Sequence, residues 1–279
     1  MPKLLPPEDF RGRRTVLTRG DFLIALKAAK PADDRIDKAT WDSVVTLPDD
    51  VAVRTTDYHG TTIRQLHDLW AAWIECYGDK KDCLFPVMLD AADDFQAATY
   101  AALTGYYRLS VSAVRSALEL VAIGTWAQVC GKLQEFKDWR AGKRTLSLGQ
   151  ACDGLIAGAH TLECDLHQLV GDSLFAQKTP NDEGGYVRRI FGGISNFTHA
   201  RPGSTDGDMR KSNGPIYVRS AFKHVSWIEF EAIALCYVLV LLARPNLPTP
   251  TPIQALFEDS TRAKSRVTRA AYQRLRREV

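Results

Sequence analysis

The chain has 279 residues, of which 45% are hydrophobic and 25% are charged, a composition typical of a soluble globular protein. Its formal charge of +3 is unevenly distributed, because residues 260–279 carry a net +6 and the other 259 residues therefore carry −3. A basic tail of this kind is typical of contact with a polyanion, or simply of a solvated chain terminus.

Three sequence features exclude whole classes of protein. The N-terminal residues contain no continuous apolar stretch of the kind found in secretory signals. The most apolar run, 232–243, is too short to span a bilayer, so no membrane segment is expected. The six cysteines are scattered without the spacing of a disulfide framework, which indicates reduced thiols. We therefore expect a cytoplasmic protein.

The N-terminal part of the chain is expected to be irregular. Residues 1–20 are rich in Pro and Arg and predict an arm, followed by a short amphipathic helix over 21–30. Residues 41–58 carry β-branched side chains around a Pro-Asp-Asp turn, which favours a small β-hairpin. After Gly60 the pattern changes to that of a helix. Its apolar face is formed by Ile63, Leu66, Leu69, Trp70, Trp73 and Ile74.

From residue 88 onward the hydrophobic pattern is helical. Four prolines, at 245, 248, 250 and 252, then precede a last helix that carries the basic tail. The predicted fold is all-α, with an arm and hairpin over 1–59, a helical bundle over 60–245, and a Pro-rich linker with a basic helix over 246–279. The predicted helices of the bundle are 88–108, 110–130, 133–141, 147–157, 159–170, 184–199 and 217–243.

Polar residues concentrate where the helix 184–199 is expected to end. His199 lies in the last turn before Pro202 and Gly203, where the helix macrodipole favours a cation. A proton-transferring group beside cations and amides fits a phosphodiester site. A His that caps the helix C-terminus in an ordinary surface loop is the alternative. The polar neighbours of His199 are Asn196, Arg201, Arg210, Lys211 and Asn213.

Two charges interrupt the otherwise apolar helix 110–130. Arg115 and Glu119 lie four residues apart and so share one face, but Arg before Glu is the less favourable order for local pairing. Charges on a core helix must either form ion pairs or serve a function. We therefore expect Arg115 and Glu119 in the interior, within hydrogen-bonding reach of segment 195–217. A purely structural ion pair is the alternative to a functional one.

Three segments resemble a known superfamily of helical proteins. They are Gly105-Tyr-Tyr-Arg108, Val114-Arg-Ser-Ala-Leu-Glu119 and Ile194-Ser-Asn-Phe-Thr-His199. Over roughly residues 88–240 the chain resembles the HEPN superfamily, small helical bundles of which many are metal-independent ribonucleases of bacterial toxin–antitoxin, abortive-infection and CRISPR-associated systems. The resemblance implies an RNA substrate, a homodimer and an antitoxin or other partner protein.

In active members of that superfamily an Arg precedes the catalytic His by five to seven positions on a helix. Here the corresponding positions, 192–194, hold no Arg. The resemblance therefore leaves two alternatives. Either another Arg completes an RNA-cleaving site in which the His is the general acid or base and the Arg stabilises the phosphorane, or the chain is a non-catalytic module that binds nucleic acid or a partner protein. The predicted catalytic set is His199, Arg201, Asn196, Arg115 and Glu119.

Basic and amide side chains outside that set are predicted to contact a nucleic-acid backbone. Such contacts are made by Lys, Arg and amide donors, and they supply affinity without sequence preference. For the residues in the tail, a solvated terminus is the alternative. The predicted set is Arg189, Arg210, Lys211, Asn213, Arg269 and Arg276.

Gly192 and Gly193 lie inside the helix that leads to His199, where each Gly costs about 1 kcal/mol relative to Ala. Their presence favours close approach of another helix or of a partner's backbone. We therefore predict a homodimer whose shared face includes residues 192–199, so that a partner's Arg could complete the site. A monomer in which the helix 217–243 encloses this helix is the alternative.

A possible metal site lies on the predicted helix 159–170. His160, Cys164 and His167 share one of its faces, and imidazole and thiolate are good zinc ligands. Their spacing matches no known zinc module, and solvent-facing polar residues account for it more simply. The sequence also lacks a nucleophile elbow, a P-loop and a dinucleotide fingerprint. We therefore expect neither a metal nor a cofactor.

Overall fold

The structure is a computed structural model that describes residues 37–76, 82–198 and 214–277. The predicted arm over 1–20 and the predicted helix over 21–30 lie outside these residues.

The all-α prediction is confirmed. About 76% of the described residues are helical, and they contain no strand beyond an isolated bridge between Thr179 and Asp182. The chain divides into two units, Met1–Pro48 and Asp49–Val279. The division thus falls at residue 48, and the basic C-terminal helix belongs to the same unit as the bundle.

The predicted hairpin over 41–58 is wrong, because this segment is helical. The short helix α3 (Lys38–Trp41) leads into this segment. It is capped by the Asp37 side chain, which accepts a hydrogen bond from the Thr40 backbone N–H. The π-helical turn η2 (Asp42–Thr46) follows, and the long helix α4 (Leu47–Glu75) runs on from it.

The burial pattern explains why this segment forms a helix in spite of its β-branched residues. Val51, Thr55 and His59 are buried and lie four residues apart, which is the spacing of one helix face and not of a strand. The Thr55 hydroxyl donates to the Val51 carbonyl oxygen at 2.8 Å, so its polar group is satisfied within the helix. Non-helical dihedral angles at His59 (φ −137°, ψ 20°) introduce a kink just before Gly60.

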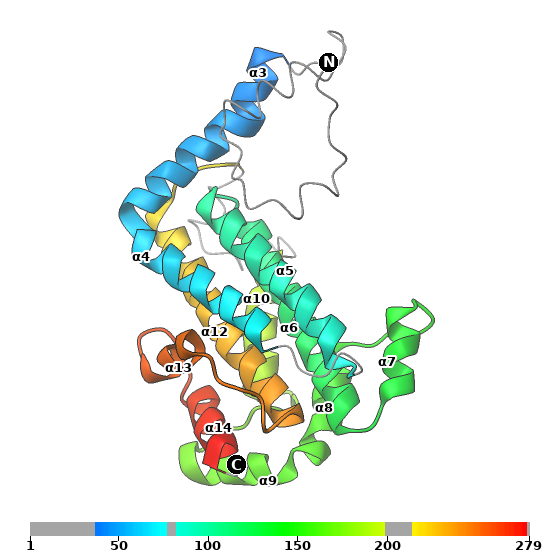
Figure 1. The fold of residues 1–279 in the computed structure, drawn as a ribbon. Coiled ribbons are helices and arrows are strands. Elements are labelled where there is room, and N and C mark those ends of the chain that lie inside the picture. Colours follow the sequence, from blue (N-terminus) through cyan, green and yellow to red (C-terminus); the bar gives the residue numbers. More distant parts are fainter. Residues whose placement is uncertain (1–36, 77–81, 199–213, 278–279) are drawn as a thin grey trace. The chain divides into compact units, whose positions relative to one another are not determined.

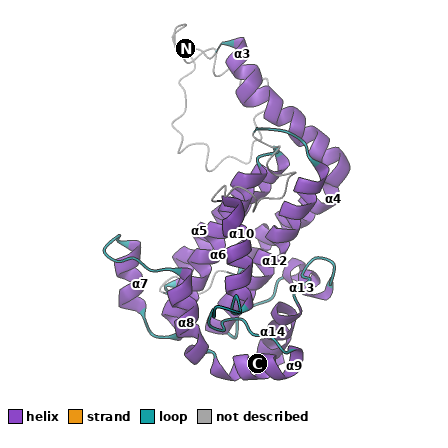
Figure 2. Cartoon of the chain, turned by 180° about the vertical axis from the view of Figure 1, so that it is seen from behind, coloured by secondary structure: helices purple, strands orange, loops and turns teal. Residues whose placement is uncertain are grey.

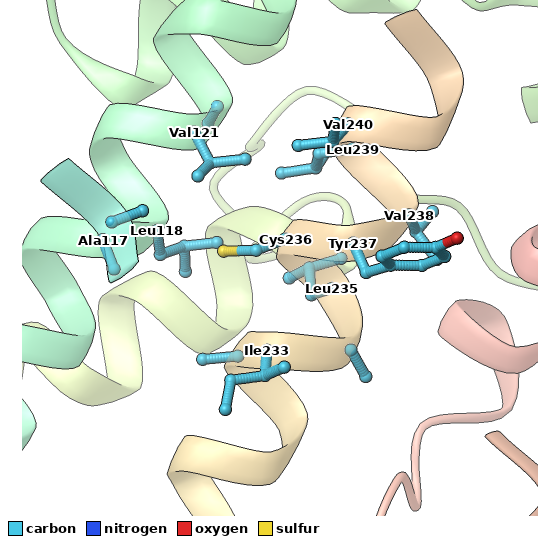
Figure 3. Close-up of a cluster of buried hydrophobic side chains, with 14 of the residues drawn as sticks. Ala117, Leu118, Val121, Ile233, Leu235, Cys236, Tyr237, Val238, Leu239 and Val240 are labelled. Atoms are coloured by element: carbon cyan, nitrogen blue, oxygen red, sulfur yellow. The ribbon is translucent and has the colours of Figure 1, made fainter. Parts of the chain in front are cut away.

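Three long helices form the centre of the second unit, as Figure 1 shows: α5 (Leu84–Leu103), α6 (Tyr107–Val129) and α12 (Arg219–Ala243). Their bounds agree with the predicted helices to within a few residues. Leu118 on α6 points at Cys236 on α12 in the fully buried interface between these helices (Figure 3). This apolar burial is the main stabilising term of the fold.

Among the described residues, α12 is the one helix that is long and apolar enough to cross a membrane. In the structure 89% of its most apolar window is buried inside the protein, which is the environment of a core helix. It carries two fully buried carboxylates, Glu229 and Glu231. A core helix with buried acids requires specific polar partners for each of them.

Four shorter helices follow α6, and they also agree with the predicted ranges. α8 begins with a capping box in which Ser147 and Gln150 satisfy each other's backbone N–H groups. Figure 2 shows α10 in front of α6, and the two helices pack against each other. The four helices are α7 (Leu133–Arg140), α8 (Leu148–Gly158), α9 (His160–Val170) and α10 (Tyr186–Thr198).

Gly105 forms the turn between α5 and α6, and its position requires a glycine. Its φ of +84° lies in the left-handed region, and an added Cβ would lie 2.6 Å from the backbone oxygen of Ile216. The Tyr107 hydroxyl next to it accepts a hydrogen bond from the Val218 backbone N–H at 3.0 Å. The turn thus fixes the segment that leads into α12.

The basic tail is a docked helix and not a frayed terminus. α14 (Arg266–Arg277) buries Val267, Ala271 and Leu275 at four-residue spacing and packs against α9 and α12. It is preceded by α13 (Thr251–Glu258), a helix that the sequence analysis missed because three prolines precede it and a fourth lies in its first turn. Pro252 lies in the first turn of α13, where no N–H partner is needed.

Candidate functional site

The helix α10, which leads toward His199, is anchored to the bundle by two arginines of its first turn. Arg188 Nη2 lies 2.5 Å from Asp153 Oδ1 on α8, and Arg189 Nη2 lies 2.6 Å from Asp172 Oδ2 in the loop after α9. Both arginines also donate to backbone carbonyl oxygens. The anchored first turn fixes the direction of the helix, and the remaining turns lie along α6.

We call the contact between these two helices the α6–α10 seam and define it by Arg115, Glu119, Phe191 and Ser195. Arg115 Nε donates to Ser195 Oγ at 3.0 Å. Arg115 Nη1 lies 3.7 Å from Glu119 Oε2, and the guanidinium carbon lies 4.5 Å from the centre of the Phe191 ring. One guanidinium group therefore joins a carboxylate, a hydroxyl and an aromatic ring from two helices.

The expectation for Arg115 and Glu119 is confirmed in one respect and wrong in the other. Arg115 does bond to segment 195–217, through Ser195, and Glu119 reaches that segment only by way of Arg115. The pair does not lie in the interior, since the two side chains are 29% and 28% exposed. The pair occupies the solvent margin of the seam, because α10 covers only part of this face of α6. Its contribution to stability is accordingly that of a screened pair.

A further carboxyl group adjoins the seam. Burial raises the pKa of Asp94 on α5, and repulsion from Asp90 and Asp93 acts in the same direction. The Ser116 hydroxyl, next to Arg115 on α6, acts on Asp94 and lowers the pKa of its carboxyl group, by less than burial raises it. The sequence analysis missed Asp94, because in the sequence it is one of several acids on the polar face of α5. Its proton affinity depends on burial, which the sequence does not show.

The other members of the predicted catalytic set lie at or beyond the end of α10. Asn196 is exposed on the last turns of the helix. His199 and Arg201 lie outside the described residues, as do Arg210, Lys211 and Asn213 from the predicted nucleic-acid-binding set. Their roles stay predictions.

Gly192 and Gly193 do not serve close packing against another helix among the described residues. Both are exposed, and an added Cβ at either position would meet no described atom within 4 Å. The part of the prediction that invoked a partner's backbone stays a prediction. Ile194 on the same helix is buried, and the half-buried Phe197 contacts the ring of His224 on α12.

The three described residues of the predicted nucleic-acid-binding set have different environments. The guanidinium of Arg189 bonds to Asp172, and that of Arg276 donates to the Leu247 carbonyl oxygen at 2.6 Å and to the Tyr237 hydroxyl at 2.5 Å. A structural role accounts for both. Arg269 is half-buried on α14, and its Nε makes no hydrogen bond with a described residue.

The possible metal ligands on α9 do not form a metal site in the described part of the chain. Cys164 Sγ lies 3.6 Å from His160 Nε2, and both residues are exposed, as is His167. No group of three or more His, Cys, Asp or Glu side chains within the described ranges could hold a metal ion. The nearby Glu163 instead accepts hydrogen bonds from the backbone N–H groups of Leu174 and Phe175.

No protein-family model, curated protein or solved structure matches this chain. The function therefore has to be inferred from the residues themselves.

Proposed function

We propose that this chain is a metal-independent RNA-cleaving effector of a bacterial defence or toxin–antitoxin type system, acting on cytoplasmic RNA from the α6–α10 seam. The observation that supports it is the 3.0 Å hydrogen bond between Arg115 and Ser195. Ser195 precedes His199 by four positions, which is one helical turn. A cation from α6 thus adjoins the helix that leads to His199, and the resemblance to HEPN proteins requires an Arg at positions 192–194, where α10 has none.

The proposed reaction uses the ribose 2′-hydroxyl as the nucleophile. This oxygen attacks the adjacent phosphorus, the bond to the 5′-oxygen breaks, and the products are a 2′,3′-cyclic phosphate and a free 5′-hydroxyl. His199 accepts the proton of the 2′-hydroxyl or donates one to the leaving oxygen. Arg115 or Arg201 stabilises the negative charge of the phosphorane, and Asn196 orients the phosphate. Glu119 holds the Arg115 guanidinium in place.

The proposed active form is a homodimer in which the open side of α10 meets its copy. Gly192 and Gly193 carry no side chain there and meet no described atom, so a second backbone can approach closely. In this arrangement an Arg of the second copy can complete the site. An antitoxin or another partner protein on the same face would block the dimer and the site together.

A non-catalytic module that binds nucleic acid or a partner protein is the second candidate. It is favoured by the contacts of Arg115, whose guanidinium already bonds to Ser195, lies close to Glu119 and stacks on Phe191. A cation held in this way has fewer donors left for a phosphate. The two candidates differ in whether His199 performs chemistry.

Expression in a bacterial host distinguishes the two candidates. The wild type should arrest growth and fragment total RNA, whereas His199→Ala should do neither. His167→Ala removes an exposed histidine of α9 and serves as the matched control, so it should behave as the wild type does. The purified protein should cleave labelled RNA equally well with and without a chelator. Equal growth of all three strains with intact RNA would contradict the enzyme and leave the binding module.

A further inference from the structure

A cavity of about 260 Å³ lies between α4, α12 and the loop that joins α13 to α14. Three of the residues that line it are cationic, namely Lys223, Arg262 and Lys264, and none is Asp or Glu. It shares no residue with the α6–α10 seam. A concave surface lined by cations without acids favours an anionic ligand.

The three cations are only weakly engaged within the protein. Lys223 and Lys264 are exposed, and neither forms an ion pair with a described residue. Lys264 Nζ lies 5.3 Å from the centre of the Trp227 ring, and Arg262 Nε lies 3.9 Å from Asp259 Oδ2 without a hydrogen bond to any described residue. The ammonium groups of Lys223 and Lys264 are therefore available to a ligand, whereas the Arg262 guanidinium lies 4.7 Å from the centre of the Phe230 ring and contributes mainly its charge.

The positive charge of this region also acts on a histidine in the cavity wall. His59, on α4, hydrogen-bonds to the Tyr217 hydroxyl at 3.1 Å. Burial lowers the pKa of His59, and the nearby charges of Arg219 and Lys223 lower it further. The surroundings thus disfavour the protonated form of His59, and a bound anion would relieve the mutual repulsion of the nearby cations.

One wall of the cavity is held in place by a buried carboxylate. Glu231 on α12 accepts hydrogen bonds from the backbone N–H groups of Lys264 and Ser265, and from the Tyr186 hydroxyl at 3.1 Å. This fixes the loop on which Arg262 and Lys264 lie. A ligand would therefore meet a preorganised wall, which lowers the entropic cost of binding.

The floor of the cavity is aromatic. Phe222 and Phe230 are buried in it, and the half-buried Trp227 exposes part of its indole. Such a surface accepts a planar ring by stacking. The volume of about 260 Å³ lies just below the roughly 300–1,000 Å³ of small-molecule sites, which suits a mononucleotide and is too small for a dinucleotide.

Comparison with a neighbouring cavity indicates where an anion would bind. It has a volume of about 380 Å³ and shares Phe230 and Arg262 with the first, but its lining includes Asp68 and Asp259. Carboxylates repel a phosphate, so the anion belongs in the first cavity, on the side of Lys223 and Lys264.

We propose that the cavity between α4, α12 and the α13–α14 loop binds a nucleoside monophosphate. The phosphate lies among Lys223, Arg262 and Lys264, and the base stacks on Trp227. This binding site is separate from the proposed RNA-cleaving site, and it stands whether or not the chain cleaves RNA.

Titration calorimetry with adenosine 5′-monophosphate, adenosine and inorganic phosphate tests the proposal on the full chain. The monophosphate should bind more tightly than either of its parts, and added salt should weaken it. The double variant Lys223→Gln/Lys264→Gln should bind it at least roughly tenfold more weakly, because two charge-assisted contacts are lost. Trp227→Ala should reduce its affinity toward that of inorganic phosphate.

The control is Lys137→Gln/Lys143→Gln, which removes two exposed lysines in and after α7 and should leave the affinity unchanged. A thermal melt of each variant establishes that it is folded. Equal affinity of the two double variants for the monophosphate would overturn the proposal. So would binding of a single-stranded RNA oligonucleotide without binding of the mononucleotide, or equal affinity for the monophosphate and inorganic phosphate.

Discussion

The α6–α10 seam and the cavity between α4 and α12 both present cations to solvent, but the surroundings of these cations differ. Arg115 in the seam has a carboxylate, a hydroxyl and an aromatic ring as partners, and the two arginines in the first turn of α10 each pair with an Asp. Lys223 and Lys264 in the cavity have no acidic partner among the described residues. The paired arginines of the seam and of α10 join helices, whereas the unpaired lysines of the cavity lower the stability through repulsion unless a ligand binds.

Glu231→Ala, which releases the loop that carries the cavity cations, should lower the stability of the protein the most. The substitution leaves the partly buried backbone N–H groups of Lys264 and Ser265 and the Tyr186 hydroxyl without their acceptor. The cost is about 1–3 kcal/mol for each of the three unsatisfied groups, and the lower end applies because all three hydrogen bonds are only part-buried, so we expect a loss of roughly 3–5 kcal/mol in the free energy of unfolding. Chemical denaturation measures it. Glu258→Ala, at an exposed position on α13, is the control and should cost less than about 0.5 kcal/mol.

Glu229→Gln should stabilise the protein in a pH-dependent manner, because Glu229 is a buried carboxyl without a cation. Burial raises its pKa from 4.5 to about 8. Thr99 Oγ1 lies 2.5 Å from Glu229 Oε1 and 3.1 Å from the Phe95 carbonyl oxygen. A hydroxyl has one hydrogen and cannot donate to both, so a protonated Glu229 completes the arrangement.

The sign of the pH effect follows from proton binding. Between about pH 4.5 and pH 8 the folded protein holds a proton on Glu229 that the unfolded chain releases, so stability falls as the pH rises through this range. The neutral amide of Glu229→Gln removes this loss. We expect a gain of up to about 3 kcal/mol at pH 7 and below about 1 kcal/mol at pH 5. Melting curves at both pH values measure it, with exposed Glu183→Gln as the control. A gain independent of pH would show that Glu229 is not the titrating group.

Arg115→Ala and Lys223→Ala test the comparison directly. Arg115→Ala removes a half-exposed ion pair, a hydrogen bond and a ring contact, and should cost about 1 kcal/mol after solvent screening. Lys223→Ala removes an unpaired charge and should change the stability by less than about 0.5 kcal/mol, with a gain more expected than a loss. Urea denaturation of both variants at low salt provides the measurement. Similar losses for the two would mean that the cavity lysine is a structural residue.

The sequence predicted the long helices well, because each shows apolar residues at helical spacing over many turns. It failed at 41–58, where β-branched residues and a Pro-Asp-Asp sequence favoured a hairpin. The helix face formed by Val51, Thr55 and His59 is too sparse in apolar residues to stand out in the sequence. The helix α13, which lies among prolines, was also missed.

Of the candidate sites, the sequence predicted the proximity of Arg115 to segment 195–217, because a charged pair on an apolar helix requires a partner. It could not predict the cavity. Lys223 and Lys264 are 41 positions apart, and only the packing of α12 and the loop before α14 brings them to one surface. Nor could it predict that Arg276 bonds inside the protein, because a basic residue on a short amphipathic helix has the same pattern whether it is solvated or docked.

Gly193→Ala should have a small effect on stability and tests the open side of the seam. The added Cβ meets no described atom within 4 Å, and Ala is favoured over Gly in a helix, so the free energy of unfolding should rise by about 0.5–1 kcal/mol. If α10 meets a second copy at this position, the same methyl group prevents the close approach of the two backbones. Light scattering at micromolar concentration should then find a dimer for the wild type and a larger monomer fraction for Gly193→Ala. Gly131→Ala provides the contrast, since it too has open space but a φ of +67°, so it should lose stability without changing the mass. A wild-type mass near 31 kDa, the mass of one chain, would exclude a site shared between two copies.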